Sequence, residues 1–148
     1  MEMIKTSKNL EETKQIAEEL LIDLKKKDLN QATVIFLSGE LGAGKTALTR
    51  AIAEILKTED RVQSPTFVIM RNLKTGDEKF KTITHIDAYR LKKNSELEIL
   101  EFDELKKDKE RLIIVEWPEN IPEFKECDAE ILIKIISETE REFNIETK

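Results

Sequence analysis

The segment Gly39–Thr46 combines residue types that together can bind a polyphosphate. It reads GELGAGKT, and Gly39, Gly44, Lys45 and Thr46 satisfy the pattern G-x-x-x-x-G-K-[ST] of a phosphate-binding loop. Three of the four glycines in the chain lie here. Backbone N–H groups can surround a phosphate only where the chain comes close and turns through conformations that a Cβ would obstruct. The segment therefore predicts a site for a nucleoside triphosphate.

Two side chains of this motif have a predicted chemical role. Lys45 can reach the β and γ oxygens, and the hydroxyl of Thr46 can complete the coordination shell of Mg²⁺. A helix beginning near Lys45 would point its positive dipole end at the phosphates. The alternative is a glycine turn between a strand and a helix, with an ordinary surface lysine. A chance match in a chain of this length occurs in about one case in a hundred or fewer, which favours the phosphate loop.

A site for Mg-nucleotide also needs a carboxylate at the end of a neighbouring strand. Two strand-like segments end in acids: TITHID ends at Asp87, and RLIIVE ends at Glu116. The pattern leaves open which acid contacts the metal and which orients the attacking water. A single acid after a strand is also common at a solvent-facing strand end, so only the combination with the loop makes these two residues candidates.

Four other polar or aromatic residues have two readings each. Thr66 could approach the γ-phosphate or belong to a turn that leads into a strand. Trp117 could shield the site or pack in the core. His85 shares a strand face with Asp87, so it could line the pocket or be an interior imidazole. Arg90 could contact phosphate or pair with a nearby acid.

Several elements must position these residues. Asn9 and Glu12 form a capping box that predicts an amphipathic helix ending near the KKKD run. ATVIFLS predicts a central strand covered on two sides, and Thr46–Leu56 predicts a helix directly after the glycine loop. The segments 66–73 and 79–86 predict two strands joined by a hairpin in which Gly76 has a positive φ.

The second half of the chain continues the pattern. A capping box at Ser95 predicts a helix through Lys107. RLIIVE and AEILIKII predict buried strands, and REFNIE predicts a weaker last strand. The expected fold is α/β, a P-loop NTPase-like layered sheet with a mostly parallel core, an antiparallel portion and helices on both faces. Residues 1–148 are expected to form a single domain.

Composition narrows the function further. The net charge of −6 and pI of about 5.1 disfavour nucleic acid as a direct partner. The apolar runs are too short to cross a bilayer and the first residues do not resemble a signal peptide, so we expect a cytoplasmic protein without a membrane span. One cysteine and one histidine cannot supply an internal disulfide or a structural zinc site. An N-K-x-D segment is absent, which disfavours guanine recognition. An arginine-rich lid is also absent, which disfavours a small-molecule kinase.

Four signatures in order carry a family resemblance. They are GELGAGKT at residues 39–46, SPTF at 64–67, HIDAYRL at 85–91 and VEWPE at 115–119. With them the sequence resembles the TsaE (YjeE) family, bacterial P-loop ATPases of tRNA threonylcarbamoyladenosine biosynthesis. The signatures span most of the chain, and the last three are the specific ones. Two positions depart from the family pattern: Ala88 stands where leucine is usual, and Glu101 stands where a glycine is common.

The resemblance implies roles for individual residues. Thr46 and Glu116 would bind Mg²⁺, and Asp87 would be important for hydrolysis. In that reaction we expect Lys45 to neutralise charge. The phosphates of ATP would be bound by Gly42, Ala43, Gly44, Lys45, Thr46 and Ala47. The implied partners are the TsaD and TsaB subunits, and direct tRNA binding by this chain alone is not expected.

Two functions fit these implications. In the first, the chain is a slow Mg-dependent ATPase that supports the TsaD/TsaB complex. In the second, it is a nucleotide-gated assembly module, in which ATP orders segments that bind a partner and hydrolysis only resets the switch.

Overall fold

The computed structural model describes residues 1–59, 70–89, 102–121 and 124–148. The predictions for Thr66, Arg90 and Glu101, and for the beginning of the helix at Ser95, lie outside these residues. The described helices and strands, in chain order, are β1 (Glu2–Ser7), α1 (Leu10–Lys25), β2 (Thr33–Gly39), α2 (Lys45–Ile55), β3 (Met70–Lys74), β4 (Thr82–Asp87), α4 (Phe102–Lys106), β5 (Arg111–Glu116), the 3₁₀-helix η1 (Pro118–Asn120), β6 (Ala129–Ile135) and β7 (Arg141–Thr147).

The described strands form one seven-stranded sheet in the order β1-β7-β6-β2-β5-β4-β3. Its centre is parallel: β2 pairs in parallel with β5 and β6, and β5 pairs in parallel with β4. Both edges are antiparallel, with β7 against β6 and β1 on one side and β3 against β4 on the other. This sheet confirms the expected α/β fold with a mostly parallel core and an antiparallel portion.

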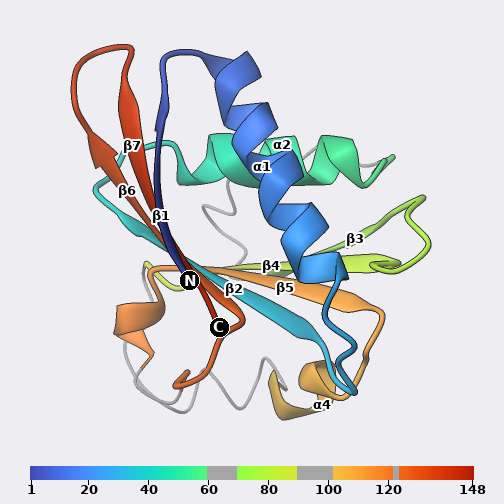
Figure 1. Cartoon of the computed structure of the whole chain (residues 1–148). Coiled ribbons are helices and arrows are strands. Elements are labelled where there is room, and N and C mark those ends of the chain that lie inside the picture. The colour runs from blue at the N-terminus through green and yellow to red at the C-terminus, as the bar shows by residue number, and fades with distance from the viewer. Residues whose placement is uncertain (60–69, 90–101, 122–123) are drawn as a thin grey trace.

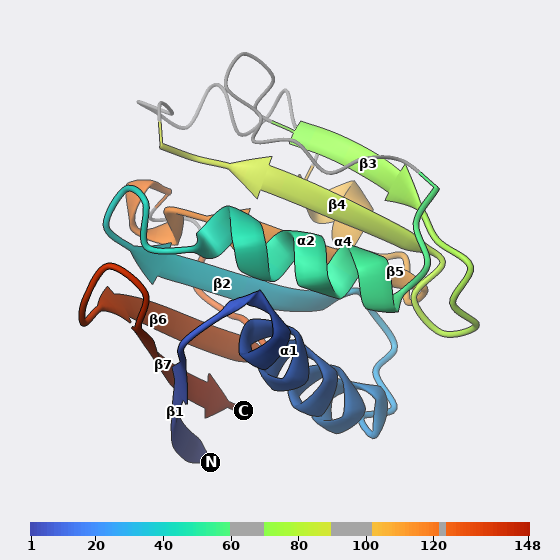
Figure 2. The same cartoon turned by 90° about the horizontal axis from the view of Figure 1, so that it is seen from above.

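Helices lie on both faces of the sheet. In Figure 1, α1 and α2 lie on one face and α4 lies on the other. Figure 2 views the first face from above and shows α1 and α2 in front of the sheet, with α2 running roughly along the direction of β2 and β4. The expectation of helices on both faces is therefore confirmed. Within the described part of the chain, no helix is both long and apolar enough to cross a membrane.

The central strand β2 is buried from both sides. Ile35 and Leu37 belong to the apolar cluster beneath α1 and α2, whereas Val34 and Phe36 belong to the cluster on the opposite face. Each such side chain contributes about 1.5–3 kcal/mol on burial. The apolar run ATVIFLS therefore forms the covered central strand that its composition predicts.

The capping box places α1 where the sequence predicts it. The Asn9 side chain accepts a hydrogen bond from the Glu12 N–H at 2.9 Å, and the Glu12 carboxylate accepts from the Lys8 N–H at 2.7 Å. The buried side of the helix then recurs at helical spacing and packs against the sheet and α2. It consists of Thr13, Ile16, Ala17, Leu20, Leu21 and Leu24.

The prediction for Gly76 is wrong. The glycines with positive φ in the described residues are Gly39, Gly42 and Gly44, and Gly76 is not among them. Gly76 instead lies against the end of α2, where its N–H donates to the carbonyls of Leu56 and Lys57 at 3.1 and 3.0 Å. An added Cβ would lie 3.3 Å from the Lys57 Cβ. The close approach of two segments, rather than the turn conformation, favours glycine at this position.

The last strands also differ from the sequence prediction. AEILIKII is not buried on both faces, because β6 alternates between buried and exposed residues. The edge strand β1 was not predicted from the sequence at all. Its residues alternate between exposed and half-buried until Ser7, so its period-2 signal is weak, and it is a strand because β7 pairs with it over residues 2–7.

Candidate functional site

Three parallel strands bring the loop and both acids to the edge of the sheet at which their carboxyl ends lie. Leu37 of β2 is in register with Glu116 of β5, and Glu116 is in register with Asp87 of β4. Side chains in register point to the same face, and Leu37 belongs to the cluster beneath α1 and α2. Both carboxylates therefore lie on the face that α2 covers. In Figure 2 the arrowheads of β2 and β4 end at this edge, where the chain turns into α2.

The glycine loop leaves open space beside two of its glycines, and we call this space the cradle. Gly42 and Gly44 have φ angles of 80° and 111°. Apart from their chain neighbours, no atom of the described residues lies within 4 Å of the position that a Cβ would take at either residue. At Gly39, with a φ of 149°, an added Cβ would lie 2.6 Å from the carbonyl oxygen of Ile133. Gly39 thus allows the loop to leave β2 alongside β6, and the described residues leave the side-chain positions at Gly42 and Gly44 open. This geometry fits a phosphate group.

The beginning of α2 faces the same space. Gly44 is its N-cap residue and brings no side chain. The N–H groups of Lys45, Thr46 and Ala47 belong to the first turn, where a helix offers them no internal acceptor. No acidic side chain lies in this turn, so the positive end of the helix dipole remains available to an anion.

Ala43, one of the predicted phosphate ligands, already forms other contacts in the fold. The Ala43 N–H donates to the carbonyl of Glu40 at 3.0 Å, and the Ala43 methyl group is buried in the core beneath α1 and α2. The side chain of Ala43 therefore anchors the loop. Its amide could bind phosphate only by sharing or giving up the bond to Glu40, unlike the amides of the first turn of α2.

Lys45 lies inside the loop and is only 5% exposed. Its Nζ donates to the carbonyls of Gly39 and Glu40, the latter at 3.1 Å, and lies 4.1 Å from the centre of the Trp117 ring. Burial lowers the pKa of the Lys45 ammonium, while the negative charge of Glu116, and then of Asp87, opposes this shift. The cation is thus held at the centre of the predicted site by carbonyls, an aromatic face and nearby carboxylates.

The two acids have different surroundings. Asp87 is half-buried and accepts a hydrogen bond from the Tyr89 N–H at 3.0 Å. Burial raises the pKa of the Asp87 carboxyl, and Glu116 raises it further. Glu116 is 3% exposed and forms a hydrogen bond with Nε2 of His85, which is fully buried. Of the two readings for His85, the structure supports the interior imidazole, because the side chain has no exposed surface that could line a pocket. Its contact with Glu116 nevertheless links it to a predicted site residue.

Trp117 also combines its two predicted uses. It packs against the cluster on the α4 face, and its ring also lies beside Lys45. Its backbone is left-handed, with φ 59° and ψ 49°, a conformation that costs about 1–2 kcal/mol for a residue with a side chain. The Tyr89 ring lies 5.0 Å from it. Strain directly after Glu116 is consistent with a functional demand on this turn.

Two residues that the sequence analysis did not select lie next to the site. The Ser38 hydroxyl donates to Glu119 at 3.1 Å, and Glu119 also acts electrostatically on Lys45. Glu119 is the last acid of VEWPE, so its place in that signature is the sequence feature that could have identified it as a site residue. Ser38 offered no signal, because a serine at the end of a strand is ordinary.

These residues fit Mg²⁺ held jointly with phosphate. Among the described residues, no three His, Cys, Asp or Glu side chains gather closely enough to hold a metal by themselves. Mg²⁺ in nucleotide sites keeps several waters and needs only one or two protein oxygens besides the phosphates. Thr46 at the start of α2 and Glu116 at the end of β5 can provide them.

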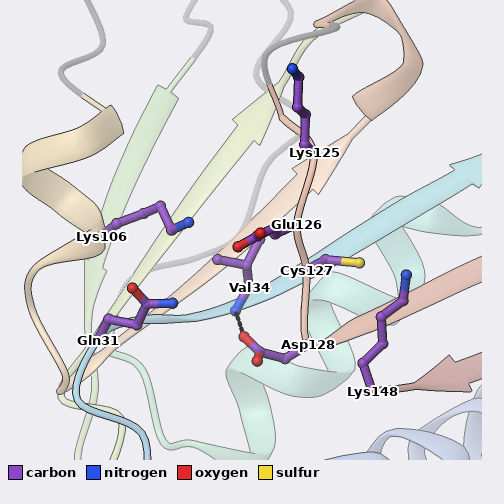
Figure 3. A pocket seen from close by; sticks show the side chains of 8 residues that line it. All are labelled: Gln31, Val34, Lys106, Lys125, Glu126, Cys127, Asp128 and Lys148. Carbon is purple, nitrogen blue, oxygen red and sulfur yellow. Dashed lines mark hydrogen bonds between the residues drawn. The ribbon is translucent and has the colours of Figure 1, made fainter.

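A separate hollow lies at the opposite end of the parallel strands. It has a volume of about 290 Å³, and Figure 3 shows the residues around it: Gln31, Val34, Lys106, Lys125, Glu126, Cys127, Asp128 and Lys148. Asp128 accepts a hydrogen bond from the Val34 N–H at 2.8 Å and so holds the beginning of β2. Burial raises the pKa of the Cys127 thiol to about 11, so this cysteine is not a thiolate nucleophile at neutral pH. The hollow is distant from the glycine loop and shares none of its residues.

Comparison with known proteins identifies the family of this chain. The profile of a family described as "Threonylcarbamoyl adenosine biosynthesis protein TsaE" matches residues 7–145. Three similar relatives are named tRNA threonylcarbamoyladenosine biosynthesis protein TsaE. The protein of Aquifex aeolicus is 35% identical over 93% of this chain and 91% of its own length. That of Rickettsia felis is 38% identical over 84% and 70%, and that of Streptomyces coelicolor is 45% identical over 62% and 60%.

A solved structure has the same fold along nearly the whole chain. The crystal structure of YdiB from Bacillus subtilis superposes with a TM-score of 0.70 at 28% identity, covering 99% of this chain and 86% of that one. The match to the family profile extends from β1 to β7 and includes the loop, both acids and Trp117. On these grounds the chain belongs to the TsaE family of threonylcarbamoyl adenosine biosynthesis proteins.

Proposed function

We propose that this chain binds Mg-ATP in the Gly39–Thr46 loop and hydrolyses it slowly, in support of the TsaD/TsaB complex that makes N6-threonylcarbamoyladenosine in tRNA. One observation carries the proposal. An open cradle at Gly42 and Gly44, a buried ammonium at Lys45 and two carboxylates on adjacent strands meet at one edge of the sheet. This combination provides both halves of a phosphate-binding site, anion contacts and metal ligands.

Each residue of the site has a defined task in the proposed reaction. The N–H groups of the loop and of the first turn of α2 bind and orient the β and γ phosphates. Lys45 balances their charge, and Thr46 and Glu116 hold the metal. Bound Mg²⁺ would neutralise charge that develops on the phosphate oxygens. Asp87, whose raised pKa reflects its burial near Glu116, lies where it can accept a hydrogen bond from a water and orient it toward the γ-phosphorus.

The substitution Lys45→Ala tests this proposal. It removes the central cation, so we expect ATP affinity to fall by at least about 100-fold, which corresponds to 2.7 kcal/mol, as measured by isothermal titration calorimetry with Mg²⁺. Lys14→Ala is the matched control, because Lys14 pairs with Glu54 on the outer surface of the helices at 2.9 Å. It should bind ATP like the unmodified protein. Unchanged ATP affinity in Lys45→Ala would refute the assignment of the loop.

A nucleotide-gated assembly module remains the second candidate. The observation that favours it is the presence of apolar side chains at the rim of the site: Leu41 in the loop is 65% exposed, and Tyr89 beside Trp117 is 45% exposed. The affinity of a partner in contact with these residues would depend directly on the state of the loop. In this case TsaD/TsaB affinity should depend on the nucleotide, and Glu116→Ala should change it more than it changes ATP binding. Partner affinity that is equal with ATP, ADP and no nucleotide would exclude this second function.

A further inference from the structure

The pair formed by His85 and Glu116 is the most deeply buried polar contact at the site. The side chains are 0% and 4% exposed, and Nε2 of the imidazole lies within hydrogen-bonding distance of Glu116 Oε2. The two residues come from adjacent strands: His85 is in register with Ile114, two positions before Glu116. The contact therefore crosses from β4 to β5 on the face beneath α2.

The chemistry of the pair determines which imidazole nitrogen carries hydrogen. A carboxylate can only accept, so Nε2 must be the donor. The other nitrogen, Nδ1, is buried and has no hydrogen-bond partner among the described residues. A buried polar atom without a partner destabilises the fold. A purely structural side chain at this position would better be apolar, as Ile83 and Ile114 are on the same face of the sheet.

Glu116 needs a fixed donor of this kind. An ionised carboxylate at 3% exposure is costly to bury unless it is hydrogen-bonded. The Lys45 ammonium contributes an attractive charge, but its hydrogen bonds go to the carbonyls of Gly39 and Glu40. Among the described residues, the side chain hydrogen-bonded to Glu116 is His85. Lys45 can therefore serve phosphate without releasing Glu116.

We propose that His85 is a positioning residue: its Nε2–H holds Oε2 of Glu116 and so fixes the carboxylate that would hold the divalent cation. This inference rests on the proposed function, because it assumes that Glu116 is a metal ligand. It assigns His85 a task in metal affinity, not in the contact with nucleotide. Groups that orient metal ligands in this way typically contribute 10–100-fold to metal affinity.

Two variants of similar size separate positioning from packing. His85→Leu fills the buried space but cannot donate, whereas His85→Gln keeps an N–H donor on a side chain of comparable length. We expect His85→Leu to weaken the apparent Mg²⁺ affinity of the ATP complex by about 10–100-fold, measured by titrating Mg²⁺ while following Trp117 fluorescence and heat. ATP affinity in EDTA should change by less than about threefold, because the loop is intact. His85→Gln should recover most of the Mg²⁺ affinity.

The outcomes distinguish this inference from the proposed function. If the unmodified protein binds neither ATP nor Mg-ATP, the proposed function fails. If it binds both and His85→Leu has normal Mg²⁺ affinity, only the positioning role fails. Equal losses of Mg²⁺ affinity and thermal stability in the Leu and Gln variants would also overturn it, because they would indicate packing alone.

A measurement on the unmodified protein does not depend on variant folding. The chain has a single histidine, so ¹⁵N NMR of the imidazole reports His85 without overlap. We expect hydrogen on Nε2 both with ATP in EDTA and with Mg-ATP, and a shift of the imidazole signals when Mg²⁺ is added. A tautomer with hydrogen on Nδ1 alone would exclude donation to Glu116. Imidazole signals that do not shift when Mg²⁺ is added would exclude coupling to the metal.

Discussion

At the scale of single residues, the site concentrates charge that a folded protein normally keeps in water. Lys45 is buried by the loop, and burial lowers its pKa. Asp87 is half-buried, and burial raises its pKa. Both shifts oppose the charged forms, so each group costs folding free energy in its ionised state. Such costs are typical of groups arranged for a ligand whose charge compensates them.

The raised pKa of Asp87 predicts a specific pH dependence. The folded protein binds the Asp87 proton more tightly than the unfolded chain does. Stability from this group is therefore complete below the unfolded pKa of 3.8 and is lost as pH rises through the folded pKa. Asp87→Asn cannot ionise and still offers an oxygen to the Tyr89 N–H. Its advantage over the unmodified protein in unfolding free energy should thus increase from about pH 4 to pH 7.

Urea unfolding at several pH values checks this prediction. The control is Asp103→Asn, since Asp103 is exposed in the first turn of α4. The difference between Asp103→Asn and the unmodified protein should not increase with pH in the same way. A free-energy difference for Asp87→Asn that is constant over this range would contradict the assigned burial of Asp87.

At the scale of elements, the loop depends on conformations that a side chain resists. Gly44 joins the loop to α2 with a φ of 111°, and Gly39 lets the chain leave β2 beside Ile133. The turn after β5 uses Trp117 in a left-handed conformation instead of glycine. Both turns direct groups toward Lys45, which indicates that the connections at this edge of the sheet are shaped for the site, not only for joining strands.

Gly44→Ala tests the loop as an element. The positive φ should cost about 1–2 kcal/mol of stability, and the new Cβ would enter the open side of the cradle. We therefore expect ATP affinity to fall by about tenfold or more, that is by at least 1.4 kcal/mol, in calorimetric titrations. The control is Gly76→Ala, which has no positive φ and lies against Lys57 at the far end of α2. ATP affinity in Gly76→Ala should remain within about twofold, and equal losses in both variants would contradict the cradle.

At the scale of the whole molecule, the site exists only when distant segments are folded together. Gly39, Asp87 and Glu116 end three different strands, and α2 lies over the same edge. A ligand that binds there binds the folded chain and not the unfolded one. Its binding free energy must therefore add to the stability of the entire sheet.

Mg-ATP should raise the unfolding free energy by about 2.7 kcal/mol at a free concentration of 100 times its Kd. Thermal unfolding with Mg-ATP, with ATP in EDTA and without nucleotide measures this increment. In Glu116→Gln the extra stabilisation that Mg²⁺ adds to ATP should be largely lost, because a neutral amide binds Mg²⁺ more weakly than a carboxylate does. The control Glu104→Gln alters an exposed glutamate of α4 and should keep the full increment. Equal Mg²⁺ effects in both variants would contradict metal binding by Glu116.

Much of this protein was decided locally and could be predicted from the sequence. The helix capped by Asn9, the buried strand ATVIFLS and the loop GELGAGKT depend on side-chain periods and turn chemistry within a few residues. Asp87 and Glu116 could be placed at strand ends for the same reason. Since such signals are short-ranged, the sequence determined the elements and the candidate residues, including the family signatures.

Only the tertiary structure decided how these residues meet. The order β2-β5-β4 and its register put Glu116 beside Asp87 and within reach of His85, and the turn at Trp117 brings its ring to Lys45. The same holds for β1, which β7 completes, and for Gly76, which the end of α2 confines. These contacts join segments far apart in the chain, and no local period specifies a partner at that distance. They depend on strand order and packing, which are set by interactions between distant parts of the chain when it folds.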